Sequence, residues 1–263
     1  MILFYFENSY FLIQTIVFFS NFHVQKAPCA RLAFNLRTRL EELSPGQRRE
    51  IVNRPYEGSA PLFISCKRGN VEIVEYLIQV CGADIEQKGA FEVPDDRSVH
   101  NVSPLWCAAV SGKLQVVEVL VKHGADINSV SDSGSTPVRS ACFMTHFEIV
   151  QFLVENGANI LKANHNGGTC LINSVQSVPL CEYLLKKGAD VNAQDIQLKT
   201  ALHYAIQEHR FETALLLLQF GAGKFSSTKI ILYSNIQSAF FIIFLKILSS
   251  KIAMVMTPFK QLV

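Results

Sequence analysis

The feature that most constrains this chain is a short motif that returns at a fixed interval. Each copy opens with a small residue, Pro and an apolar residue, as in SAPLF, VSPLW and STPVR, and closes with Gly-Ala. Pro104 and Pro137 are 33 residues apart, and so are Gly124 and Gly157. Such a period indicates a repeat protein, in which each copy is one structural unit that stacks on its neighbours.

The interval and the opening match the ankyrin repeat and its T-P-L-H-x-A pattern. Openings with Pro, or with Cys or Ala in its place, stand at positions 61, 104, 137, 170 and 201. Each leads to a second segment with apolar residues three and four apart, such as VEIVEYLIQ and LQVVEVLVK, which is the period of an amphipathic helix. The sequence therefore predicts an all-α fold, an ankyrin-repeat solenoid of paired antiparallel helices with projecting β-turn fingers.

Two positions of the motif have clear physical tasks. Pro presets φ for the first turn of a helix, where its missing N–H is not needed. Four residues later every repeat carries a small residue, which lets two helices approach closely: Ser65, Ala108, Ala141, Ser174 and Ala205. Cys66 and Cys142 follow directly in two of the repeats, and we expect both to face the neighbouring helix.

The repeats differ in length at two places. Pro61 and Pro104 are 43 residues apart, and the excess predicts a long finger at residues 86–100 that overhangs the concave face. Cys170 and Ala201 are only 31 residues apart, so we expect this repeat to be distorted between its helices. The predicted ankyrin region is 58–224, with repeats at 58–85, 101–132, 134–163, 167–195 and 198–222, after a degenerate leading repeat at 30–57 in which a helix begins at Ser44-Pro45.

The two ends of the chain are apolar and lack the repeat. Residues 1–24 and 225–263 are rich in Phe, Ile, Leu, Asn, Lys, Tyr and Ser. Glu7 interrupts the first segment and Lys246 the second, so neither holds the roughly 20 apolar residues that a membrane span requires. We expect both to lie outside the fold and interpret them as translated non-coding sequence, in preference to a signal peptide or an anchor.

Composition and motifs argue against several kinds of function. A net charge of +2 without a block of Lys or Arg does not favour nucleic-acid binding. The seven Cys form neither a CxxC pair nor a disulfide framework, which indicates reduced, buried thiols in a cytoplasmic protein, with the nucleus as an alternative. The sequence carries no phosphate-binding loop or hydrolase motif. We expect no catalytic residue, metal, cofactor or membrane partner, and we expect His203 to stabilise the start of its helix through a hydrogen bond.

A solenoid of this kind binds through its long concave surface. We expect the residues two, three and six positions after the Pro to line that surface, which brings together Trp106, Arg139 and Phe143, with Asp95 of the long finger folding over them. These four are the candidate peptide-binding residues, because Arg grips a carboxylate bidentately and aromatic residues anchor interfaces. In the alternative interpretation, Trp106 packs under the finger and Arg139 pairs with Asp95 or Asp96.

Several strings are more specific than a general ankyrin pattern. PLWCAA, STPxRxACF and TCL, together with the long finger, resemble the N-terminal ankyrin domain of the feminization (Fem) proteins over residues 36–222. Fem proteins are substrate receptors of cullin-RING ubiquitin ligases, whose ankyrin groove captures the C-terminal ends of target proteins, often ending in Arg. The resemblance implies that Arg139 meets a peptide carboxylate, that Phe143 stacks on the peptide, and that Trp106 and Asp95 match a groove aromatic and an acidic finger residue.

Two departures bear on the implied function. Met144-Thr145 stands where the family has Asp-Gly, and one branch of the family uses that Asp to hold a terminal Arg, so negative charge is left to Asp95 and Asp96. Residues 225–263 do not resemble the family's later helical region or its elongin-docking box, so an elongin–cullin complex is expected as a partner only of a longer form. We expect a module that binds C-terminal degrons; the alternatives are a general ankyrin scaffold and a membrane-tethered ankyrin protein.

Overall fold

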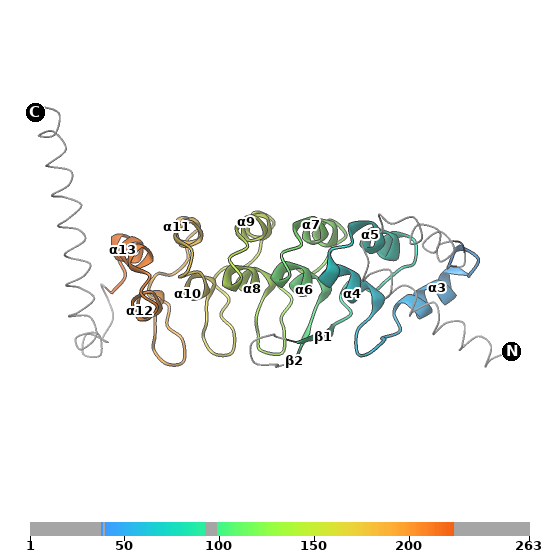
Figure 1. Cartoon of the computed structure of the whole chain (residues 1–263), viewed down its shortest axis with the longest axis horizontal. Helices are drawn as coiled ribbons and strands as arrows, with labels where there is room; N and C mark the ends of the chain where they lie inside the picture. Colours follow the sequence, from blue (N-terminus) through green and yellow to red (C-terminus); the bar gives the residue numbers. More distant parts are fainter. Residues whose placement is uncertain (1–37, 39, 93–98, 224–263) are drawn as a thin grey trace, which may run out of the picture. The chain divides into compact units, whose positions relative to one another are not determined.

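The computed structural model describes residues 38, 40–92 and 99–223. The apolar ends, 1–24 and 225–263, lie outside these residues, so the expectations for them stay untested. The chain divides into two compact units, Met1–His165 and Asn166–Val263. In its described part, each unit is built from the helix pairs of ankyrin repeats (Figure 1), which confirms the predicted fold class.

In the described part of the first unit, the helices form two rows (Figure 1). They are α3 (Pro45–Val52), α4 (Pro61–Arg68), α5 (Val71–Gln79), α6 (Pro104–Val110), α7 (Leu114–Lys122), α8 (Pro137–Phe143) and α9 (Phe147–Glu155). The first helices of the repeats, α4, α6 and α8, pack side by side in one row, and the second helices α5, α7 and α9 form the other. Each first helix also packs against its own second helix, as the ankyrin pattern requires.

The second unit contains α10 (Cys170–Asn173), α11 (Val178–Lys186), α12 (Ala201–Gln207) and α13 (Phe211–Gln219) in its described part. The helix α10 is only four residues long, and two side chains form hydrogen bonds with backbone carbonyls in and just after it. The Ser174 hydroxyl donates to the Cys170 carbonyl at 2.6 Å, and the Cys181 thiol donates to the Ser174 carbonyl at 3.0 Å. Pro179 lies in the first turn of α11, where a missing N–H has no cost. This short helix is the distortion expected from the 31-residue interval.

Side-chain caps hold the first turn of several helices. Ser44 and Gln47 form a reciprocal capping box at α3, so this helix starts at the predicted position. At α6, the Ser103 hydroxyl accepts a hydrogen bond from the Trp106 N–H at 3.2 Å. The small hydroxyl residue before the Pro therefore orients the first turn of the helix, and with it the residues that this turn presents.

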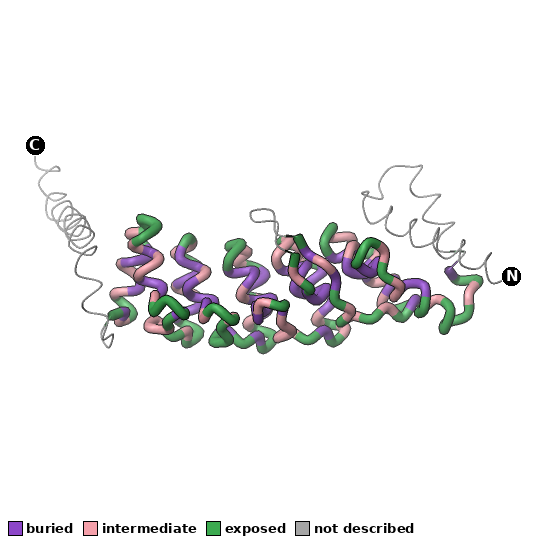
Figure 2. The backbone as a smooth tube through the Cα atoms, turned by 90° about the horizontal axis from the view of Figure 1, so that it is seen from below, coloured by how far each residue is buried: buried purple, intermediate pink, exposed green. Residues whose placement is uncertain are grey.

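The small residues of the repeat motif lie where helices meet. All five are completely buried: Ser65, Ala108, Ala141, Ser174 and Ala205. The cysteines of the described part are buried, and none of them forms a disulfide with another: Cys66, Cys81, Cys107, Cys142, Cys170 and Cys181. Figure 2 shows the buried stretches gathered in the helices and the exposed ones in the connecting turns. Among the described helices, none combines the length and the apolar character needed to cross a membrane.

The ten-residue excess between the first and second repeats forms a β-hairpin on the first unit. Its strands β1 (Gly89–Glu92) and β2 (Val99–Val102) are antiparallel, with Gly89 opposite Val102. Phe91 and Val102 are buried against the helices, whereas Val99 is 62% exposed. The second strand runs two residues beyond the predicted finger and leads directly into the Ser103 cap of α6.

The hairpin is also tied to the next finger of the same unit. The Lys88 ammonium donates to the Val130 carbonyl at 3.0 Å, and the Asn101 N–H donates to the Asp132 carboxylate at 2.9 Å. These contacts join residues about 30 to 40 positions apart in the sequence. The hairpin is therefore held from two sides, by the helices beneath it and by the neighbouring turn.

We predict that Gly89→Ala displaces the hairpin. A Cβ built on Gly89 would lie 2.6 Å from a ring atom of Phe63, and this ring is 1% exposed, so it has no free space to move into. Overpacking of this kind costs about 1–3 kcal/mol of unfolding free energy. Urea unfolding should show this loss, with a red-shifted emission of Trp106. Gly46→Ala meets no atom within 4 Å and serves as the control; equal stability of the two variants would contradict the docked hairpin.

In the second unit, His203 caps α12 as the sequence predicted. The Thr200 N–H donates to Nδ1 of His203 at 3.1 Å, and the Thr200 hydroxyl lies 2.9 Å from the same atom. Burial lowers the pKa of His203, and the nearby Asp195 carboxylate opposes this effect without reversing it. The neutral ring is favoured because Nδ1 must keep its lone pair to accept from the helix start.

This cap predicts that α12 loses stability in acid. Because the pKa of His203 is lower in the folded chain, its contribution is fully present above the unfolded value of about 6.5 and is lost as pH falls through the folded value. Hydrogen-exchange protection of residues 200–207 should be constant from about pH 8 to about pH 6.5 and should fall as the pH is lowered further towards about 5. In His203→Gln the side chain can still accept a hydrogen bond from the helix start but does not change charge with pH. The protection of residues 200–207 should then depend much less on pH. An unchanged slope in that variant would assign the effect to another group.

Candidate functional site

The β-hairpin decides which part of the first-helix row is open in the first unit. Phe63 and Trp106, two positions after the Pro of their repeats, are only 1% and 6% exposed, and Cys107 is fully buried. The expectation that these residues line an open concave surface is therefore wrong. The hairpin was expected to overhang the surface, but it packs onto it and converts these positions into core.

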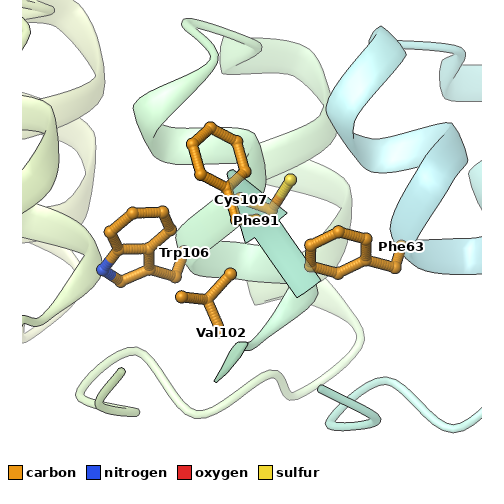
Figure 3. Packing of buried hydrophobic residues seen from close by; sticks show 5 residues of the cluster. All are labelled: Phe63, Phe91, Val102, Trp106 and Cys107. Atoms are coloured by element: carbon orange, nitrogen blue, oxygen red, sulfur yellow. The ribbon is translucent and has the colours of Figure 1, made fainter. Parts of the chain in front are cut away.

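Trp106 is the largest residue beneath the hairpin. Phe91 of β1 meets it edge to face, with ring centroids 5.4 Å apart and planes at 72°. Figure 3 shows Phe63, Phe91, Val102 and Cys107 around it in one cluster, with the indole nitrogen directed away from Phe63. Of the two roles that the sequence left open, packing under the finger is the one observed; direct contact with a ligand stays a prediction.

Among the residues that the structure describes, the buried indole nitrogen of Trp106 has no hydrogen-bond partner. Buried N–H donors are nearly always paired, because an unpaired one loses its bond to water. The sequence analysis did not identify Phe91 as the residue that packs against Trp106. In the structure, burial alternates along GAFE, as in a strand with one face turned inward.

A second row of the first helices stays open. Six positions after the Pro of each repeat stand Lys67, Val110 and Phe143. Lys67 is exposed, Val110 is partly buried against the cluster under the hairpin, and Phe143 is 58% exposed. This row, called the open row below, runs along α4, α6 and α8 and presents a cation, an aliphatic side chain and an aromatic ring.

Arg139 lies one helical turn before Phe143 on α8. One guanidinium nitrogen, Nη1, donates to the Ser135 hydroxyl at 2.9 Å, and this hydroxyl lies 2.9 Å from that of Ser140. The side chain is half-buried, so its direction is restrained by neighbours. The structure thus brings Arg139 and Phe143 together on one helix. Asp95 lies outside the described residues, and its place over this pair stays a prediction.

The turn after Phe143 has an unusual backbone. Thr145 has φ of +56°, in the left-handed region that a β-branched residue rarely adopts, and the preceding repeats have Gly69 and Gly112 at this point. Met144 beside it is 43% exposed. The turn therefore holds two large apolar side chains, Phe143 and Met144, at the surface next to Arg139.

Burial makes three of the thiols poor nucleophiles. Burial raises the pKa of Cys107 and of Cys181 to about 12, and that of Cys81 to about 11. Thiols with such values stay protonated near neutral pH, and the thiolate is the reactive form. Within the described residues, no group of three or more His, Cys, Asp or Glu side chains is placed to hold a metal ion.

We predict that Trp106 contributes to stability as a core residue. Trp106→Ala should lower the free energy of unfolding by about 3–5 kcal/mol, because it leaves a cavity beneath the hairpin. Trp106→Phe should cost much less, because it keeps a ring beside Phe91 and gives up no hydrogen bond. Urea unfolding followed by circular dichroism measures both. Wild-type stability of the alanine variant would place Trp106 on an open surface.

Comparison with known proteins agrees with this architecture. Ankyrin-repeat family descriptions match residues 57–87 ("Ankyrin repeat"), 105–154 ("Ankyrin repeats (many copies)") and 161–228 ("Ankyrin repeats (3 copies)"), together more than half of the chain. The chain is 41% identical over 86 residues to Protein fem-1 homolog CG6966 of Drosophila melanogaster and 37% identical over 186 residues to Protein fem-1 homolog A of Rattus norvegicus.

These matches cover 33% and 68% of this chain, and 13% and 28% of the two relatives. The chain thus spans between about an eighth and little more than a quarter of the length of these fem-1 relatives. A weaker match, 26% identical over 64% of this chain, is to 8% of the E3 ubiquitin-protein ligase KEG of Arabidopsis thaliana. With the paired helices and the specific motifs of its repeats, the chain belongs to the ankyrin-repeat family, as a member of the Fem type.

Proposed function

We propose that this chain recognises the C-terminal ends of target proteins, as the substrate-recognition part of a ubiquitin-ligase receptor. Ankyrin repeats are protein-interaction modules, and the stacked first helices offer an extended surface for a partner. The proposal goes further, because it names a peptide carboxylate as the group that is bound. Its main support is that Arg139 lies one helical turn before the exposed ring of Phe143 on α8.

The chemistry of this pair suits a peptide end. A guanidinium presents a planar fork of donors that matches the two oxygens of a carboxylate. The Ser135 hydroxyl bond restrains Arg139 on one side, so less side-chain freedom is lost when a ligand binds. Phe143 offers apolar area beside the cation, and aromatic residues and Arg often supply much of the binding energy of interfaces. Asp95 and Trp106 complete the proposed set of peptide-binding residues.

The link to ubiquitin ligation rests on similarity. The matched relatives include fem-1 proteins and a protein named as an E3 ubiquitin-protein ligase. Because the chain covers 28% or less of these relatives, assembly with elongin and cullin is proposed for a longer form. In this proposal the chain is not an enzyme, it needs no cofactor, and it acts in the cytoplasm or the nucleus without nucleic-acid or membrane partners.

Peptide titration tests the proposal. Fluorescently labelled peptides would be titrated with the full chain, each as the free acid and as the C-terminal amide. We expect saturable binding that needs the carboxylate and becomes roughly ten- to a hundredfold weaker in Arg139→Ala, as for loss of a charge-assisted hydrogen bond. Arg210→Ala is the matched control, because Arg210 is exposed in the second unit and its side chain does not cap α13.

The opposite result is equally clear. Binding that is the same for acid and amide peptides, or that persists in Arg139→Ala, would overturn carboxylate recognition. The chain would then act as a general ankyrin scaffold, and Arg139 would stabilise the turn around Ser135.

A further inference from the structure

We infer that the open row contains a second charged subsite at Lys67, which receives an acidic side chain five or six residues before the C-terminus of the bound peptide. The inference rests on the proposed function, because it takes the peptide carboxylate at Arg139 as its starting point. It adds a specificity-determining residue two repeats away, on α4.

Lys67 is a restrained cation. Its ammonium lies 4.7 Å from the centroid of the Phe91 ring, a distance at which a cation is attracted to the face of an aromatic ring. Phe91 cannot move freely, since Trp106 meets it edge on and it is 9% exposed. The hairpin covers part of the first-helix surface, and through Phe91 it also positions the ammonium of Lys67 at the border of the exposed part.

The ammonium of Lys67 is available to an acid. Among the residues that the structure describes, the recorded ion pairs join Arg54 to Glu50 and Lys186 to Glu182, and neither involves Lys67. Phe91 covers one side of the ammonium, and the residue itself is exposed, so a carboxylate has access from solvent. An acidic side chain that pairs with Lys67 would therefore meet an ammonium whose position Phe91 already restrains.

The surface between Lys67 and Arg139 suits an extended peptide. Val110, on α6 between α4 and α8, is partly buried against the cluster beneath the hairpin and provides an apolar floor. Phe63 and Trp106 lie buried in the cluster beneath the hairpin (Figure 3). Lys67 and Phe143 of the open row are exposed. A peptide that lies along this row passes from Phe143 over Val110 to Lys67.

Helix spacing sets the position of the acid. Packed helices have axes about 8–10 Å apart, so the two steps from α8 to α4 span roughly 16–20 Å. An extended chain advances about 3.3 Å per residue. An acidic side chain about five or six residues before the terminal carboxylate therefore reaches Lys67 when the carboxylate is at Arg139.

The test moves one glutamate along a peptide. A set of labelled peptides with the same free C-terminus would carry a single Glu at each of the third to eighth positions before the last residue. Binding to the full chain would be measured for the wild type, Lys67→Gln, Lys67→Arg and Lys122→Gln. Lys122 is the matched control, because it is an exposed lysine on the second helix α7.

We expect affinity to peak with Glu at the fifth or sixth position, by roughly two- to fivefold, as for an ion pair near the surface. The peak should disappear in Lys67→Gln, remain in Lys67→Arg and Lys122→Gln, and shrink as salt is added. A wild-type affinity that does not depend on the position of Glu, or a peak that survives in Lys67→Gln, overturns the subsite while the carboxylate dependence stands. If no peptide requires its carboxylate, the proposed function fails, and this inference fails with it.

Discussion

A single ankyrin helix pair cannot bury its own apolar face, so each pair depends on close contact with the next one. The contact is made possible by the small residues four positions after the opening of each repeat. In the first unit, Ser65, Ala108 and Ala141 are fully buried between neighbouring helices. Larger side chains there would separate α4, α6 and α8 and remove the row of first helices. The spacing that stabilises the fold is thus also the spacing of the binding surface.

The β-hairpin modifies this surface. By packing Phe91 and Val102 onto Phe63 and Trp106, it turns part of a generic concave face into hydrophobic core. The same contact places Phe91 beneath the ammonium of Lys67 and leaves Val110 as a partly open floor. The inserted hairpin therefore covers one part of the first-helix surface and borders the part that stays exposed. Its position depends on the packing of Phe91 against Trp106, and the pairing of β1 with β2 keeps Phe91 in place.

The candidate site illustrates how binding features accompany local strain. Thr145 occupies a left-handed backbone position where earlier repeats have glycine, and Phe143 and Met144 are held exposed beside it. Unfavourable backbone angles and exposed apolar side chains both reduce stability, and they persist only where the surrounding structure determines them. In the third repeat, these features gather next to Arg139, the residue on which the proposed function depends.

Local sequence patterns are enough to predict the repeat architecture, the helix starts at Ser44-Pro45 and Pro104, the buried small residues, the distorted repeat around α10 and the cap at His203. They also bring Arg139 and Phe143 together, since residues four apart share one face of a helix. These features depend on residues within one or two helical turns of each other or on the regular repeat length, and both can be recognised in the amino-acid sequence. The burial of Phe63 and Trp106, in contrast, depends on tertiary packing, because Phe91 of β1 packs onto one residue 28 positions before it and another 15 positions after it. The hairpin is stabilised on the helices by the burial of apolar side chains that are distant in the sequence, and a local sequence pattern does not reveal such contacts.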